Sequence, residues 1–241
     1  MTRSPRSIAE CEKTLPPGTD ERFSGYGVMG LPFASGHCLA LRHFPVSSLG
    51  DGYDSVWHRD PSGSWVIHSS VAPDLSCARY FGSALEDAEI DDISVTWTGP
   101  SAFTVEVKDK IEWEVELGRS VATAAMTRLG QLMPAGWWRR PKVLSAMSRV
   151  ARPALGVGRV RLAGTTSNGQ QFQANPRMLW TVKRSRALID GTDIGPPGPL
   201  PEQASLGDFW IPQRGIFVVG ESYFEPYDPA RHSAARPDDG V

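Results

Sequence analysis

Two places in the sequence put acid and base groups at a spacing that suits chemistry. In an extended segment Tyr53–His58, Asp54 and His58 point to the same side, because side chains alternate along a strand. A carboxylate and an imidazole on one face can exchange protons with a shared ligand. Asp54 and His58 are therefore candidate catalytic residues, and the alternative is an ordinary pair of polar residues facing solvent.

The second place is the loop Leu206–Gly215, which leads into an apolar run. It holds Asp208, Trp210 and Arg214 within seven positions. Functional residues concentrate on loops that a rigid scaffold holds in place. We expect Arg214 to clamp a carboxylate of a ligand, and Asp208 to act as a base or to pair with Arg214.

Tryptophan is abundant, with eight residues in a chain of 241. Indole rings can form the walls of a broad apolar cavity, and their N–H groups supply a polar contact. The candidate ligand-binding residues are Trp57, Trp97, Trp180 and Trp210, beside Arg214. Packing in an ordinary core is the alternative interpretation of these rings.

Other reactive residues carry weaker signals, and the sequence predicts neither a metal nor a cofactor. No HxH, HxxxH or CxxC pair supplies two metal ligands close together. Of the three cysteines, Cys77 is expected to be a small buried apolar residue. Lys108 and Lys110 would suit a Schiff base, but Asp109 and the turn between them favour a solvated hairpin tip.

The segment 25–30 matches the letters of the GxGxxG dinucleotide-binding motif. That motif needs a buried strand before it and a helix after it. Neither is predicted, since Leu31-Pro32 is a poor helix start. We expect a glycine-rich loop.

Short strands must position these residues. A first block of apolar runs rich in Val, Ile and aromatics is separated by turn residues, which predicts an antiparallel meander. Its runs are His37–Phe44, Tyr53–His58, Trp65–Val71, Ile93–Trp97, Phe103–Val107 and Ile111–Leu117. A second block contains an Asn-Gly turn signal between its first two runs. Its runs are Val160–Thr165, Gln171–Ala174, Leu179–Val182, Ala187–Ile189 and Gly215–Phe224.

Between the blocks, residues 119–155 have helical spacing over Val121–Met133 and Val143–Leu155. The fold class predicted is mainly β, an antiparallel calycin- or lipocalin-like barrel or two packed half-barrels, with this helical pair inserted. One domain spans 23–227, and flexible tails span 1–22 and 228–241.

The charges are segregated along the chain, although the net charge is only −2. Residues 117–189 carry 13 basic residues and no acidic one. Nucleic acid is not an expected partner, because nucleic-acid binders keep a positive surplus over the whole domain. The basic helices are interpreted as a cover across one barrel end or a lid; membrane contact is not favoured, because their apolar stripe is small and rich in alanine. A cytoplasmic location is expected, since no apolar signal core follows the first residues.

Three segments carry a resemblance to known proteins. The run Asp60–Trp65, the run Ile93–Pro100 and the strand Ile111–Leu117 resemble the lipocalin-type family that includes carotenoid 1,2-hydratases (hydroxyneurosporene synthases). This resemblance implies a barrel whose cavity binds, hydrates or cyclises a polyene or polyketide. The family's catalytic residues have no matching positions here, and the helical segment 119–155 departs from its pattern.

A second resemblance is to acetoacetate-decarboxylase-like proteins, through Tyr53–Val56 followed by Ser76–Gly82. The lysine that this family uses has no match near Met126, where Leu129 stands instead. The leading hypothesis is a protein that binds a small hydrophobic or planar molecule and acts as a lyase, isomerase or cyclase. The alternatives are a non-catalytic module that binds a partner through its basic helices, and an acetoacetate-decarboxylase-like enzyme.

Overall fold

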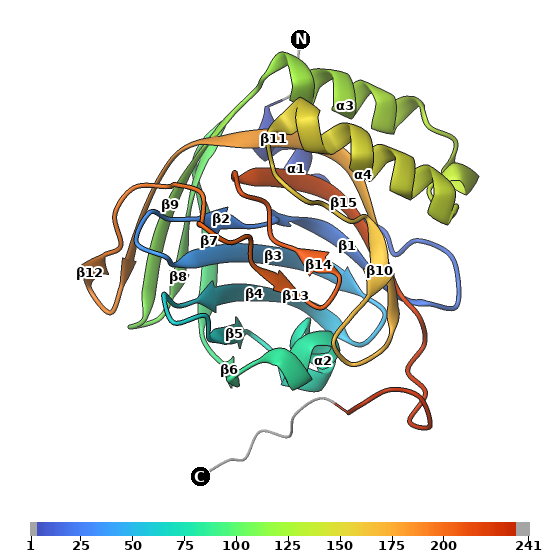
Figure 1. Ribbon diagram of the computed structural model, residues 1–241, viewed down its shortest axis with the longest axis horizontal. Coiled ribbons are helices and arrows are strands. Elements are labelled where there is room, and N and C mark those ends of the chain that lie inside the picture. The colour runs from blue at the N-terminus through green and yellow to red at the C-terminus, as the bar shows by residue number, and fades with distance from the viewer. Residues whose placement is uncertain (1–3, 235–241) are drawn as a thin grey trace.

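The computed structural model describes residues 4–234 and is mainly β, built on one large mixed sheet with helices at its borders (Figure 1). The sheet has the strand order β6-β5-β4-β3-β1-β15-β11-β9-β8-β7. These strands are β1 (Glu21–Val28), β3 (Cys38–Ser47), β4 (Asp51–Arg59), β5 (Trp65–Ser69), β6 (Asp87–Ile90), β7 (Ile93–Gly99), β8 (Ala102–Val107), β9 (Ile111–Gly118), β11 (Gln171–Ile189) and β15 (Ile216–Phe224).

Shorter elements complete the fold. The remaining strands are β2 (Leu31–Pro32), β10 (Ala163–Thr165), β12 (Thr192–Asp193), β13 (Ser205–Leu206) and β14 (Phe209–Trp210). The α-helices are α1 (Pro5–Ala9), α2 (Ala78–Phe81), α3 (Val121–Leu132) and α4 (Pro141–Leu155), with 3-10 turns at Pro73–Leu75, Gly82–Ala84 and Ala135–Trp137.

The sheet is open along its path. β6 and β7 are its two ends, and no strand pairing joins them within the described part of the chain. Neighbouring strands are antiparallel except for β5 and β6, which run parallel. The predicted β-rich class and the meander β7-β8-β9 are confirmed, whereas closure into a barrel is not.

The glycine-rich segment 25–30 is largely strand, so the prediction of a loop there was wrong. β1 lies between β3 and β15, and its Gly25 is paired with Gly220. A Cβ atom on Gly25 would lie 2.0 Å from the carbonyl oxygen of His43. Glycine is needed here because the neighbouring backbone approaches closely, at a position where the register with β3 shifts.

Three short strands predicted between residues 171 and 189 are parts of one strand, the 19-residue β11. The sequence concealed this because Pro176 interrupts the apolar pattern. In the structure the register with β15 shifts between Pro176 and Met178, so the bulge accommodates a residue without an N–H. β11 is therefore long enough to pair with β10 near its start and with β12 near its end.

The helical pair forms as predicted and has identifiable ends. Ser120 and Thr123 form a capping box at the start of α3. α4 begins at Pro141 and ends at Leu155, and the cap residue Gly156 that follows has a φ of 65°, in the left-handed region. Along α4, Leu144, Met147 and Ala151 are buried, and Val150 is 54% exposed.

Parts of the two predicted tails are folded. Residues 5–9 form α1, and its Ala9 is buried in the main hydrophobic core. At the other end, His232 is buried and its Nδ1 accepts a hydrogen bond from the Asp228 N–H. Residues 1–3 and 235–241 of those tails lie outside the described residues. In the described part of the chain, none of the helices has the length and apolarity needed to cross a bilayer.

The sheet packs on both of its faces, and alternation along β3 shows how. Leu39 and Leu41 belong to a cluster that contains Trp113, whereas Cys38 and Ala40 belong to a second cluster that contains Trp57. We refer to these as the Trp113 face and the Trp57 face. On β15, Ile216 and Val218 pack with α3 and α4, on the Trp57 face. The helices α2, α3 and α4 and the β13–β14 hairpin therefore cover the Trp57 face, whereas α1 packs on the Trp113 face.

Candidate functional site

A cavity of about 120 Å³ lies on the Trp57 face, between the sheet and the elements that cover it. Residues of β1, β3, β11 and β15 line it from the sheet, and residues of α3, α4 and β14 line it from the cover. An engineered apolar cavity of about 150 Å³ binds benzene. The present cavity is somewhat smaller, so a single ring or a short aliphatic chain is the upper limit of what it can enclose.

Small residues of three neighbouring strands leave room for the cavity. Gly25 on β1 is paired with Gly220 on β15, and Ser222 on β15 is paired with Ala174 on β11. All four line the cavity. A Cβ atom on Gly25 or Gly220 would meet the backbone carbonyl of His43 or Asn175, so the two glycines are required by the close approach of the strands and add no side chain to the cavity wall.

Arg42 is the principal polar feature of this site. It lies on β3, lines the cavity, and is only 4% exposed. Its Nη1 donates to the carbonyl oxygens of Val28 and Leu41 at 2.7 and 2.8 Å, and its Nη2 donates to that of Met29 at 3.4 Å. No carboxylate pairs with Arg42 among the described residues. Burial lowers the pKa of Arg42 to about 10, which still leaves the guanidinium charged at neutral pH.

Aromatic rings enclose this cation. The guanidinium carbon of Arg42 lies 4.6 Å from the ring centroid of Trp57 and 5.5 Å from that of Phe209. Cation–π contacts of this kind hold a guanidinium in place without neutralising it. Cys77 also lines the cavity, and its Sγ lies 3.0 Å from the Tyr53 hydroxyl. Burial raises the pKa of the Cys77 thiol, so Cys77 is the buried apolar residue that the sequence predicts and not a thiolate nucleophile.

Polar residues of β11 and β15 also border the cavity. Among its described lining residues the one carboxylate is Glu221, which accepts hydrogen bonds from Arg177 at 3.3 Å and from the Tyr223 hydroxyl at 2.9 Å. Its side chain alternates with that of Ser222, and Gln173 and Asn175 alternate with Ala174 in the same way. The Glu221 carboxylate and the two amides therefore lie on the other face of their strands, away from the cavity.

The four candidate tryptophans separate between the two faces of the sheet. Trp57 and Trp210 line the cavity. Trp97 and Trp180 belong to the core on the Trp113 face, where the Trp97 indole N–H donates to the Tyr26 hydroxyl at 3.4 Å. The sequence could not make this separation, because it required knowing which side of each strand α4 covers.

Asp54 and His58 lie on one face of β4 as predicted, but it is the Trp113 face and not the face with the cavity. Each pairs with a histidine instead of meeting the other. Asp54 Oδ1 lies 2.6 Å from His43 Nδ1, and His58 Nε2 lies 3.0 Å from His37 Nδ1. Burial and the neighbouring His37 and His68 lower the pKa of His58 to about 4. The structure thus separates these two candidate catalytic residues from the cavity.

The predicted pair of Asp208 and Arg214 does not form. Asp208 Oδ1 lies 2.5 Å from Arg161 Nη1, and its Oδ2 accepts a hydrogen bond from the Thr165 N–H. Arg214 is exposed and makes no ion pair within residues 4–234. The prediction was wrong because Arg214 is only six residues from Asp208 in the sequence. In the structure, the loop after α4 places Arg161 beside Asp208 instead.

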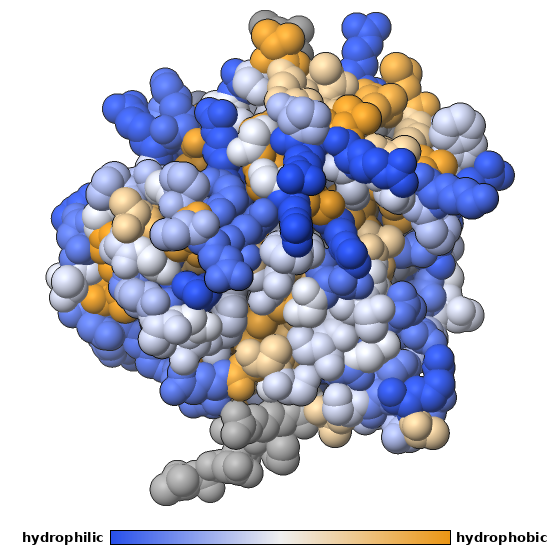
Figure 2. Space-filling view, viewed as in Figure 1, coloured by the Kyte–Doolittle hydropathy of each residue, from blue (hydrophilic) through white to orange (hydrophobic). Residues whose placement is uncertain are grey.

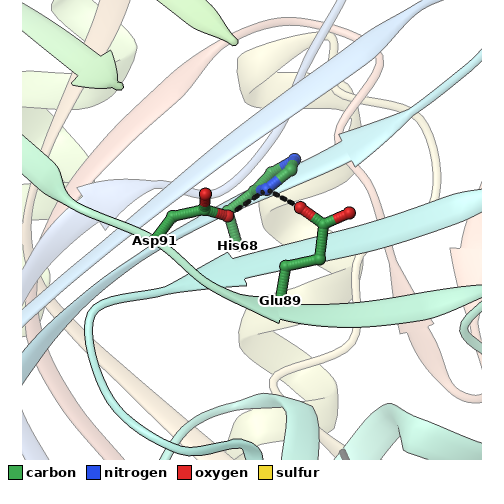
Figure 3. A group of neighbouring side chains, drawn as sticks. All are labelled: His68, Glu89 and Asp91. Carbon is green, nitrogen blue, oxygen red and sulfur yellow. Dashed lines mark hydrogen bonds and ion pairs between the residues drawn. The ribbon is translucent and has the colours of Figure 1, made fainter. Parts of the chain in front are cut away.

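Away from the cavity, one group of side chains has the composition of a metal site (Figure 3). The buried His68 on β5 points its Nδ1 at Asp91 Oδ2 and Glu89 Oε2, at 2.8 and 3.2 Å. Lys110 donates to Asp91 at 2.7 Å and also to Glu89. Burial raises the pKa of Asp91, but the hydrogen bonds from Lys110 and His68 outweigh it and hold that pKa below its ordinary value. The lysine ammonium already occupies the place between the carboxylates that a cation would take, so the group fits an ion-pair cluster better than a metal site.

Sequence reasoning missed Arg42 as a candidate. A signal for Arg42 was present: in Cys38–Phe44 an arginine shares one side of an apolar strand with Cys38 and Ala40. A charged residue at an inward position is rarely buried without a functional or pairing reason.

No protein-family model and no curated protein matches the chain. Among solved structures, the chain is similar to the crystal structure of acetoacetate decarboxylase from Legionella pneumophila subsp. pneumophila. The identity is 10%, the match covers 92% of this chain and 90% of that chain, and the TM-score is 0.37. A similarity of this size leaves the function to be argued from the site itself.

Proposed function

We propose that the protein binds a small molecule with a planar or apolar body and an anionic oxygen, either a carboxylate or an enolate, in the cavity beside Arg42. The observation that supports this most directly is a buried guanidinium that lines an apolar cavity without a carboxylate partner. Burying a charge is costly unless it is paired. A ligand anion would supply the missing partner.

The hydrogen-bonding capacity of Arg42 supports the same proposal. A guanidinium has five N–H donors. The contacts with Val28, Leu41 and Met29 use three of them, which leaves one donor on Nη2 and one on Nε without a partner in the described chain. Two adjacent N–H groups suit the two oxygens of a carboxylate or the oxygens of an enolised dicarbonyl.

The site also favours one class of substrate over another. A polyene hydrocarbon has no anionic oxygen to contact Arg42, whereas a polyketide-like or β-dicarbonyl molecule has an enolate that a guanidinium stabilises. A lyase, isomerase or cyclase that forms an enolate needs a cation at the developing oxyanion, and Arg42 is placed to supply it.

Calorimetric titration with cinnamate and cinnamamide tests the proposal, because the two probes share a shape and differ in charge. We expect cinnamate to bind with one site per chain and at least tenfold more tightly than cinnamamide, since a hydrogen bond to a charged group contributes roughly 1.5–3 kcal/mol. Equal affinities, or no binding of either probe, would contradict the proposal.

A further inference from the structure

A second hollow adjoins the cavity, and its lining is basic. This groove has a volume of about 540 Å³ and is lined by Arg149 and Arg152 of α4, by Arg159 and Arg161 of the following loop, and by Trp210. We refer to it as the arginine groove. Figure 2 shows strongly hydrophilic residues beside α4, between the helices and the lower part of the molecule.

The groove carries more positive charge than its surroundings neutralise. Arg161 pairs with Asp208, but Arg149 bonds only the Ser145 hydroxyl, at 3.2 Å. Arg159 lies over the Trp210 ring at 4.8 Å. Arg152 has no ion-pair partner within residues 4–234. No acidic residue occurs between Glu116 and Asp190 of the sequence, so this part of the chain supplies no counter-charge.

Beside the paired Arg161, the other three arginines of the groove repel one another, and a bound anion removes that repulsion. All four cations are arginines. A planar guanidinium donates two parallel hydrogen bonds to a phosphate, whereas a lysine acts as a point charge. The Ser148 hydroxyl also lines the groove, although it already donates to the Leu144 carbonyl. The composition therefore favours a phosphoryl group over a single carboxylate.

The groove and the cavity are neighbours that share lining residues. Val160, Arg161 and Trp210 line both. A ligand that passes these three residues places one end among arginines and the other end in an apolar space. We propose that the arginine groove binds the phosphate or diphosphate of an amphiphilic ligand whose apolar end occupies the cavity. The apolar end rests on the proposed function of the cavity, and the phosphate site does not.

Titrations with octyl phosphate, octanol and inorganic phosphate test this proposal. The expected result is at least tenfold tighter binding of octyl phosphate than of either fragment, because one molecule fills both hollows. The variant Arg149→Gln/Arg152→Gln should lose about tenfold or more in affinity for octyl phosphate and keep its affinity for cinnamate. The matched control, Arg119→Gln/Arg128→Gln, changes two exposed arginines outside the groove and should leave both affinities unchanged.

Two results would overturn the proposal: equal affinity for octyl phosphate and octanol, or equal loss in the groove variant and the control variant. If cinnamate binds and octyl phosphate gains nothing over octanol, the groove proposal alone fails. If octyl phosphate binds through the arginines and cinnamate does not bind, the cavity proposal alone fails.

Sedimentation with phosphatidic acid vesicles identifies the source of the phosphate. If the natural protein sediments with the vesicles and the groove variant does not, the phosphate belongs to a lipid headgroup. If octyl phosphate binds but the protein does not sediment with the vesicles, the phosphate belongs to a free phosphate ester.

Discussion

The guanidinium carbon of Arg42 lies 4.6 Å from the ring centroid of Trp57, on the covered face of the sheet and beside an apolar cavity. The ring fixes the cation and excludes water from one side of it, but it cannot neutralise the charge. An arginine held in this way is preorganised for an anion, because its orientation changes little when the anion arrives. The contact also links ligand binding to a fluorescent side chain.

The two faces of the sheet predict different roles for Trp57 and Trp97. Titration with cinnamate should quench the intrinsic fluorescence saturably, and Trp57→Phe should remove most of that quenching and weaken binding about fivefold. Trp97→Phe is the matched control, since Trp97 is also buried but lies on the opposite face. Both variants should lose roughly 0.5–3 kcal/mol of unfolding free energy. Equal quenching in the two variants would place the ligand elsewhere.

Arg214 is predicted to be dispensable. It is exposed and lies outside the described lining of the cavity and of the arginine groove, so Arg214→Ala should shift neither the melting temperature nor the affinity for cinnamate.

Arg161→Ala breaks the contact with Asp208 and should destabilise the protein by about 1 kcal/mol or less, because both side chains are partly exposed. Thermal melts and titrations of both variants check this, and a loss of affinity in Arg214→Ala alone would restore it to the site.

Borohydride trapping tests Lys108 and Lys110 as Schiff-base nucleophiles. Burial lowers the pKa of Lys110, but the hydrogen bonds to Asp91 and Glu89 outweigh it and raise that pKa above its ordinary value. A nucleophilic lysine needs the opposite shift. No lysine is among the described residues that line the cavity. Mass spectrometry after incubation with acetoacetate and borohydride should therefore show no adduct on either lysine, and an adduct would favour the acetoacetate-decarboxylase-like alternative.

Because the pKa of His58 is lowered in the folded protein, we expect the unfolding free energy to fall in mild acid. Its pKa of about 4 in the folded protein is lower than the ordinary value of 6.5, so the unfolded chain takes up the proton first as the pH falls. The contribution of His58 is fully present above pH 6.5 and is lost progressively towards pH 4, by at most about 3 kcal/mol. Urea denaturation at pH 7 and pH 4.5 measures this, and the difference should be smaller in His58→Gln. An unchanged difference would remove His58 as its source.

Local patterns predicted much of the fold. The strand β4 and the helix α4 were visible because each has a complete periodicity and clear ends. β1 was hidden, because a glycine that is required by the close approach of His43 looks like a loop residue. β11 was hidden because Pro176 is tolerated only at a bulge that long-range pairing with β15 creates.

The candidate site was less predictable than the fold. Trp57 and Trp210 were identified by their type alone, and Arg42 was passed over although its strand pattern placed it among apolar residues. Whether a strand side faces a core or a cavity depends on the helices that cover it, and those helices are far away in sequence. Asp54 and His58 share a strand face as predicted, yet nothing local showed that His43 and His37 would be their partners. Their catalytic role stays a prediction, as do the lipocalin-type resemblance and partner binding by the basic helices.

The affinity of Arg42→Met for cinnamate tests the central claim most directly. Methionine removes the charge at a similar volume, but it also removes the hydrogen bonds to Val28, Leu41 and Met29, so urea denaturation must first show that the variant is folded. It should bind cinnamate about 10- to 150-fold more weakly, the equivalent of roughly 1.5–3 kcal/mol, and should bind cinnamamide as before. A folded Arg42→Met that keeps the full affinity for cinnamate would contradict the assignment of Arg42 as the anion-binding residue.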